Sequence, residues 1–202
     1  MKLFYSANSP YARIARIAAF ECGVDFEPVL LESQQLRHPD NPVLAYNCTG
    51  RIPTIVDGDT VVTESRACSR YLESVGNGNQ LFAYAGDWQA EQMENTAMSF
   101  LDGCALWTRE YRRPEEKQFD WLVDVERDRA ERSLAWFNAQ PAIQNNETPW
   151  DFAHITLAVG IEYQDFRSLS PDWQDRHGAV ADWLAAQLER PGMKAHPMVQ
   201  GA

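Results

Sequence analysis

The stretch Thr49-Gly50-Arg51-Ile52-Pro53-Thr54-Ile55-Val56 is followed, after a short turn, by Val61-Val62-Thr63-Glu64-Ser65. Residues 54–56 and 60–63 are rich in β-branched side chains and are predicted to form two short strands. Asp57-Gly58 supplies the positive φ that a tight turn needs, so the two strands are expected to pair antiparallel.

Pro53 is the unusual residue of this stretch, because proline cannot donate a hydrogen bond to a strand ladder. At the start of a strand it marks an edge, a turn or a cis peptide bond. A helix is predicted to begin near Ser65, and its N-terminus would offer free N–H groups and a positive dipole end to a carboxylate. The stretch is therefore either an ordinary hairpin with a capped helix or a ligand site, and the N-terminal residues must distinguish the two.

The N-terminal residues predict a strand, a loop, a helix and a second strand. Residues 3–5 form the first strand and residues 26–31 the second. Ser9 followed by Pro10 is a strong helix start, with serine as N-cap and proline in the first turn. The helix is expected to stop at Gly23.

Two motifs carry a resemblance to a known family. Ser9-Pro10-Tyr11-Ala12 stands where glutaredoxins carry Cys-Pro-Tyr-Cys, and Ser-Pro-Tyr-x-Arg is frequent in bacterial glutathione transferases. Asn47-Cys48-Thr49-Gly50-Arg51-Ile52-Pro53 resembles the family motif Asn-Pro-x-Gly-Lys-Val-Pro, with Cys in place of Pro and Arg in place of Lys. With Glu64-Ser65, these motifs make the chain similar to cytosolic glutathione S-transferases of the bacterial type that has Ser at the thiol position.

The resemblance covers nearly the whole chain and implies two domains. An α/β thioredoxin-like domain (βαβαββα) is expected over residues 1–76 and an all-α helical bundle over residues 87–202. Residues 77–86 would form the linker, which opens at the turn Gly76-Asn77-Gly78-Asn79. Helical spacing of apolar residues supports the all-α half; the marker residues are Met93, Ala97, Phe100, Cys104, Trp107 and Tyr111, then Phe119, Val123, Ala130, Leu134 and Phe137 in a helix over 115–139, then Phe152, Ile155, Val159, Tyr163 and Phe166, then Val180, Trp183, Leu184 and Leu188.

Glutathione is the co-substrate that the resemblance implies. The backbone of Ile52, before a cis Pro53, would bind its cysteinyl part, and Glu64 and Ser65 would hold its γ-glutamyl end. His38 lies where the family often has a residue that reaches the glycine carboxylate, although a lone surface histidine is usually only solvated. The implied glutathione-binding set is Arg51, Ile52, Pro53, Glu64, Ser65 and His38.

Ser9 is the candidate residue at the thiol. A free thiol has a pKa of about 8.5, so a hydroxyl hydrogen bond and a helix dipole would favour the thiolate. Tyr5 is the rival, because some classes use a tyrosine at the end of the first strand, but it also fits a core position. Ser9 and Ala12 replace both cysteines of the redox motif, which disfavours disulfide exchange.

A second-substrate pocket is implied at Tyr11, Trp107 and Tyr111, against the first helix and the long helix of the second half. The alternative is that Trp107 and Tyr111 belong to the helical core.

One departure from the family pattern concerns stability: the helix that starts near residue 152 has Asp151 as a cap, but His154 stands where most members carry Asp.

Composition limits the partners. The 202 residues carry a net charge of −11, which argues against nucleic acid and anionic membranes as partners. The N-terminus does not resemble a signal peptide, and no apolar run is long enough to span a bilayer. The four cysteines have no CxxC spacing and indicate reduced thiols in a cytoplasmic protein. The histidines have no metal-ligand spacing, so no metal is expected.

The expected function is glutathione S-transferase activity towards a small hydrophobic electrophile, by a homodimer as in the family. A non-catalytic transferase-like module for binding or assembly is the alternative from another class. A glutathione-dependent peroxidase or lyase would use the same thiolate, and the sequence does not separate it from a transferase.

Overall fold

The computed structural model describes residues 1–77 and 80–199 and divides into two compact units. The first unit holds Met1–Ala83 together with the segment from Pro191 onward, and the second holds Tyr84–Arg190. The C-terminal segment therefore groups with the first unit, whereas the expected helical domain ran from 87 to 202. Residues 78 and 79 of the expected turn lie outside the described residues.

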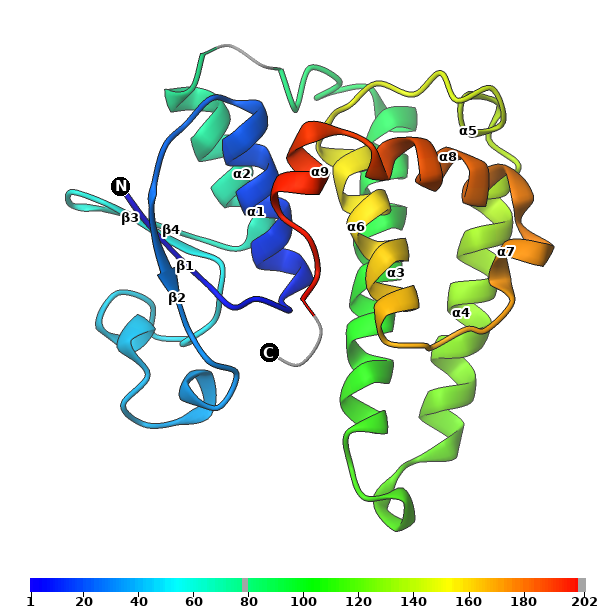
Figure 1. The fold of residues 1–202 in the computed structure, drawn as a ribbon, viewed down its shortest axis with the longest axis horizontal. Helices are drawn as coiled ribbons and strands as arrows, with labels where there is room; N and C mark the ends of the chain where they lie inside the picture. The colour runs from blue at the N-terminus through cyan, green and yellow to red at the C-terminus, as the bar shows by residue number, and fades with distance from the viewer. Residues whose placement is uncertain (78–79, 200–202) are drawn as a thin grey trace. The chain divides into compact units, whose positions relative to one another are not determined.

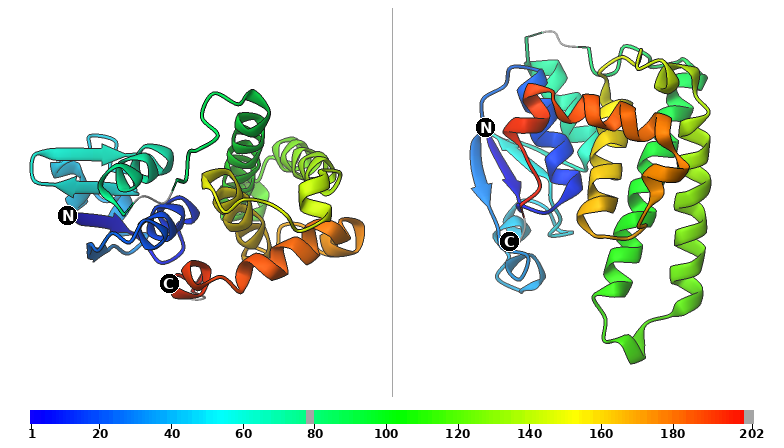
Figure 2. Two further views of the ribbon diagram at one scale, coloured as in Figure 1. Left: turned by 90° about the horizontal axis from the view of Figure 1, so that it is seen from above. Right: turned by 45° about the vertical axis from the view of Figure 1, so that its right-hand side comes forward.

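The first unit is a four-stranded sheet with helices on one face (Figures 1 and 2). Its elements are β1 (Lys2–Tyr5), α1 (Pro10–Glu21), β2 (Glu27–Leu30), the 3₁₀ turns η1 (Gln35–Arg37) and η2 (Pro42–Ala45), β3 (Thr54–Asp57), β4 (Thr60–Thr63), α2 (Ser65–Val75) and α9 (Pro191–Ala195). This confirms the thioredoxin-like fold. The two 3₁₀ turns occupy the place of the second helix in the expected order, because Pro39 and Pro42 interrupt that region.

The strand order is β2-β1-β3-β4. β1 pairs parallel with β2 and antiparallel with β3, and β3 pairs antiparallel with β4. Gly58, at φ +57°, lies in the turn between β3 and β4, as the Asp-Gly dipeptide predicts. The register places Phe4 opposite Thr54, and Thr54 opposite Thr63.

Helices α1 and α2 pack against each other on one face of the sheet. The buried residues of α1 are apolar except for Arg13, and Ile14, Ile17 and Ala18 are fully buried. The sheet's other side carries a smaller apolar cluster of Phe4, Leu31 and Val43, against which Ile52 packs. The loop that precedes β3 is therefore anchored by apolar contacts to the sheet.

The second unit is all-helical (Figure 1). Its elements are α3 (Trp88–Tyr111), η3 (Glu115–Lys117), α4 (Asp120–Asn138), α5 (Pro141–Gln144), α6 (Phe152–Phe166), α7 (Trp173–Arg176) and α8 (Gly178–Leu188). α6 is the central helix: residues 151–161 are all buried, and Gly160 lets it approach Phe100 of α3 closely. A Cβ at Gly160 would lie 3.2 Å from the Phe100 ring.

The predicted helix over 115–139 begins five residues late, at Asp120 of α4. After Pro114 the chain makes only the 3₁₀ turn η3, and the Phe119 N–H donates to the Glu110 carboxylate at 2.8 Å. The prediction that Phe119 points inward is wrong, since its side chain is 57% exposed and packs at a tilt against the Trp121 ring. The other marker residues of this helix are buried as predicted: Val123, Ala130, Leu134 and Phe137.

Candidate glutathione site

Three chain segments meet at one end of the sheet. Because β1 and β3 are antiparallel, the carboxyl end of β1 lies beside the start of β3, and the end of β4 lies beside it in turn. Tyr5, Pro53 and Glu64 directly follow or precede the matched residues of these three strands. The topology therefore brings together the predicted thiol and glutathione motifs, which are separated by more than forty residues in the sequence.

Ser9 caps α1. Its backbone is extended (φ −83°, ψ 114°), and its Oγ accepts a hydrogen bond from the Ala12 N–H at 3.2 Å. A hydroxyl has one proton to donate besides its two lone pairs, so the cap leaves that proton for another acceptor. The side chain is half-buried at the positive end of a 12-residue helix.

Two buried asparagines hold the loop before β3. Asn41 Nδ2 donates to the Gly50 carbonyl at 2.8 Å, and Asn47 Nδ2 donates to the Arg51 carbonyl at 3.2 Å. Asn47 Nδ2 also reaches the Thr54 hydroxyl at 3.1 Å. The Ile52–Pro53 peptide bond between these anchors is cis. The backbone of Ile52 is thus fixed on both sides by side-chain hydrogen bonds.

Glu64 has a left-handed backbone (φ 71°), which is uncommon for a residue other than glycine. Such strain is found preferentially at functional sites. Glu64 is also the N-cap of α2, and no side chain of the described residues caps this terminus with a hydrogen bond. The Glu64 side chain is exposed, whereas Ser65 is only 2% exposed. The N-terminus of α2 directly follows β4, and the positive end of a helix dipole favours an anion.

The remaining predicted residues of the first unit lie in different environments. Tyr5 is half-buried, and the Arg16 guanidinium lies 4.5 Å above its ring centroid. Arg51 is exposed. The His38 side chain is 63% exposed, and its Nδ1 accepts from the Asp40 N–H at 3.2 Å. Tyr11 is half-buried in the first turn of α1.

The other two residues of the predicted second-substrate pocket belong to the second unit. Trp107 is fully buried, in contact with Tyr111 at 5.8 Å between ring centroids, whereas Tyr111 is 43% exposed. The Arg127 guanidinium lies 5.9 Å from the Trp107 ring. Trp107 therefore occupies the core of the helical unit, the alternative that its place in the apolar stripe allowed.

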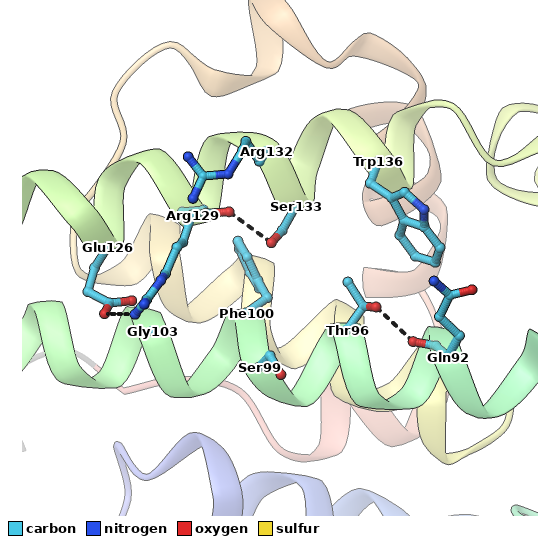
Figure 3. Close-up of a pocket in the computed structure, with 11 residues that line it drawn as sticks. Gln92, Thr96, Ser99, Phe100, Gly103, Glu126, Arg129, Arg132, Ser133 and Trp136 are labelled. Atoms are coloured by element: carbon cyan, nitrogen blue, oxygen red, sulfur yellow. Dashed lines mark hydrogen bonds and ion pairs between the residues drawn. The ribbon is translucent and has the colours of Figure 1, made fainter.

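A groove of about 330 Å³ lies between α3 and α4 (Figure 3). Within α4, Arg129 pairs with the buried Glu126 at 2.6 Å, and Trp136 forms one end of the groove opposite Gln92. None of the residues predicted for glutathione or for the second substrate lines it.

Among residues 1–77 and 80–199, no helix combines the length and apolarity needed to cross a membrane. Over the same ranges, no group of three or more His, Cys, Asp or Glu side chains is arranged to hold a metal ion.

Sequence reasoning missed part of the site. Asn41 and Asn47 hold the loop, and the Asx turn in which Thr49 N–H donates to Asn47 Oδ1 at 3.0 Å is the signal that could have revealed the role of Asn47. Arg16 was also missed, because its contact with Tyr5 joins two elements with no sequence pattern between them.

The fold, a thioredoxin-like sheet followed by a helical unit, matches solved glutathione S-transferase structures. Residues 8–75 match the family model described as glutathione S-transferase, N-terminal domain. The chain thus carries this domain and has glutathione S-transferase homologues.

Two curated relatives differ in sequence identity to this chain and in how much of it they match. Glutathione S-transferase 4 of Zea mays is 32% identical over 116 residues, which cover 52% of each chain. The GST-like protein YibF of Escherichia coli is 25% identical over 178 residues, which cover 86% of each. The chain spans about half the length of the maize relative that it matches.

Solved structures match over nearly the full length. A glutathione S-transferase from Methylobacillus flagellatus, crystallised with glutathione bound, is 27% identical with a TM-score of 0.86, and the match covers 98% of this chain and 99% of that one. A glutathione transferase family member from Pseudomonas fluorescens Pf-5, also with bound glutathione, is 28% identical with a TM-score of 0.85 and 98% coverage of both chains.

Proposed function

We propose that this protein is a glutathione S-transferase that ionises the glutathione thiol beside Ser9 and transfers the sulfur to a small apolar electrophile. The observation that carries the proposal is that the end of β1, the start of β3 and the end of β4 lie side by side. The segments with Ser9, Ile52-Pro53 and Glu64-Ser65 adjoin these strand ends. The glutathione bound in the two solved relatives supports the same ligand.

Each group has a role that its chemistry supports. The N-terminus of α2 would bind the γ-glutamyl carboxylate, and the exposed Glu64 carboxylate would pair with the α-amino group. The backbone of Ile52 would pair with the cysteinyl backbone. His38 is proposed for the glycine end, and Arg51 is proposed as a further glutathione-binding residue; both side chains are exposed.

Ser9 would act as a hydrogen-bond donor and not as a base. Its Oγ already accepts from the Ala12 N–H, so its proton can point at a thiolate sulfur. Together with the dipole of α1, this bond would lower the pKa of the bound thiol below its free value of about 8.5. The product thioether forms when the sulfur lone pair attacks the electrophilic carbon and the leaving group departs with its electron pair.

The same proposal includes a homodimer in the cytoplasm. Unpaired cysteines at all four positions are consistent with a reducing compartment.

The proposed site is tested by calorimetric titration of glutathione and S-hexylglutathione into the wild-type chain, Ser65→Ala and Ser69→Ala. Ser69 is the matched control, since its buried hydroxyl donates to the Ser65 carbonyl at 2.8 Å within the same helix. We expect micromolar to millimolar binding, tighter for the alkylated ligand. Ser65→Ala should weaken glutathione binding about two- to tenfold, which corresponds to the loss of one hydrogen bond. Ser69→Ala should leave the affinity unchanged.

No binding of either ligand would favour the non-catalytic module. Equal affinity of Ser65→Ala and wild type would remove Ser65 from the site. Turnover assays with halogenated aromatics and with hydroperoxides then separate transferase from peroxidase activity.

A further inference from the structure

The C-terminal segment, residues 191–199, lies along α1 within the first unit (Figures 1 and 2). At its start, Gly192 of α9 approaches α1 so closely that a Cβ there would lie 3.2 Å from the Phe20 ring and 3.5 Å from Ile17. Further along, His196 lies opposite Arg13 and Arg16. The segment therefore runs back along α1, from its C-terminal end towards its first turn.

His196 is held by two arginines of α1. Arg13, which is 1% exposed, donates from Nε to the His196 carbonyl at 2.5 Å. One Nη of Arg16 lies 3.0 Å from His196 Nδ1. The Phe20 ring packs against the imidazole edge-on at 6.3 Å. Because a guanidinium only donates, Nδ1 must be the acceptor, and the bound imidazole is neutral with its proton on Nε2.

Burial and the charges around His196 both favour this neutral state. Arg13 and Arg16 face it from α1, and Lys194 precedes it on α9. On β1, Tyr5 lies beneath the Arg16 guanidinium. Burial, and then the two arginines, lower the pKa of His196 to about 4. A protonated ring would add a positive charge next to two guanidinium groups.

We propose that Arg13, Arg16 and His196 form a latch that positions the C-terminal segment against the first half of α1, so that residues 197–199 form part of the wall at the thiol end of the site. The latch stands on the contacts alone, whereas the wall rests on the proposed function. Arg13 lies four residues after Ser9, which is about 6 Å along the helix. Three extended residues span about 10 Å, so residues 197–199 are long enough to reach the first turn.

His196 is thus a positioning residue. It acts through the segment that it holds and not by contact with a reacting atom. Arg16 links the latch to the site a second time, because the same guanidinium covers the Tyr5 ring at the end of β1.

The latch is tested with two variants of matched size. His196→Phe keeps a ring against Phe20 but has no acceptor for Arg16, whereas His196→Gln keeps an acceptor oxygen. Hydrogen–deuterium exchange of the intact chain near pH 7 should show faster exchange over residues 191–199 in His196→Phe and near wild-type exchange in His196→Gln. Unchanged exchange in α1 and the sheet shows that the unit is folded. Equal protection of wild type and His196→Phe, or equal loss in both variants, would overturn the latch.

The wall is tested by steady-state kinetics on the same variants. His196→Phe should raise the KM for the electrophile about two- to tenfold, as the loss of one contact predicts, with the KM for glutathione unchanged. His196→Gln should restore it. An unchanged KM for the electrophile together with fast segment exchange would overturn the wall. An inactive wild-type chain would instead overturn the proposed function, and the exchange experiment would still decide the latch.

Discussion

Asp151 and His154 form a buried pair at the N-terminus of α6. Asp151 Oδ1 accepts the His154 N–H at 3.0 Å and lies 2.7 Å from the ring Nδ1 of the same histidine. The family pattern would place a carboxylate at His154, which would return a bond to the backbone of the cap. Here the imidazole instead binds the capping carboxylate, so one aspartate satisfies both the helix end and the histidine ring.

Asp151→Ala should therefore destabilise the helical unit by about 2–4 kcal/mol, since it removes a cap and leaves a buried ring nitrogen without its partner. Asp151→Asn keeps an acceptor oxygen and should cost about 1 kcal/mol. Urea unfolding, followed by tryptophan fluorescence, measures both. Similar midpoints for the two variants would show that the pair contributes little.

Substitution of Asn47 should change both the stability of the protein and its affinity for glutathione. Asn47→Ala loses the hydrogen bonds to Arg51 and Thr54 that hold the loop. The free energy of unfolding should therefore fall by about 1–3 kcal/mol, and glutathione binding should weaken. Thr49→Val is the control, because it removes only the hydrogen bond from the hydroxyl of the exposed Thr49 to Asn47 Oδ1. Calorimetric binding and urea unfolding provide the comparison. Full affinity in Asn47→Ala would mean that the loop is rigid without this side chain.

The cysteines should differ sharply in reactivity. Burial raises the pKa of the Cys22 thiol to about 11 and that of Cys68 to about 12, and it also raises the pKa of Cys104. Cys48 is exposed. A thiol-specific reagent at pH 8 should therefore modify one of the four thiols rapidly in the native protein. Cys48→Ser should abolish the fast phase, and a remaining fast phase would contradict the buried environments.

Because of His196, the free energy of unfolding should depend on pH. Its pKa is about 4 in the folded protein and about 6.5 in the unfolded chain, so the unfolded chain binds more protons between these values. The stabilising contribution is intact above pH 6.5 and is lost as pH falls towards 4. The difference in unfolding free energy between wild type and His196→Gln should therefore shift in favour of the variant over this range. If the difference in unfolding free energy between wild type and His196→Gln stays constant from pH 7 to pH 4, the lowered pKa of His196 is contradicted.

Local signals in the sequence predicted much of the fold. Ser9-Pro10 marked the start of α1, and Asp57-Gly58 marked the hairpin, because caps and tight turns depend on a few adjacent residues. The start of α4 was missed because Phe119 fits the apolar period. Pro114 ends α3, and the Phe119 N–H donates to the Glu110 carboxylate, so the regular helix begins only after Phe119.

Long-range contacts could not be predicted from the sequence. The glutathione motifs could be placed at one sheet end only through the family resemblance, since their meeting depends on strand order. The contact of His196 with Arg13 joins residues 183 positions apart, and no spacing rule indicates it. The fully buried state of Trp107 was one of two alternatives that a helical stripe allows.

The most direct measurement of the central claim is the ionisation of bound glutathione. Thiolate absorbance near 240 nm is followed against pH for glutathione saturating the wild-type chain and Ser9→Ala, with glutathione alone as reference. We expect an apparent pKa of the bound thiol clearly below the free value of about 8.5 in wild type and a return towards that value in Ser9→Ala, with little change in affinity. Glutathione that binds with an unshifted pKa, or an equal shift in both proteins, would contradict the role of Ser9 in activating the thiol.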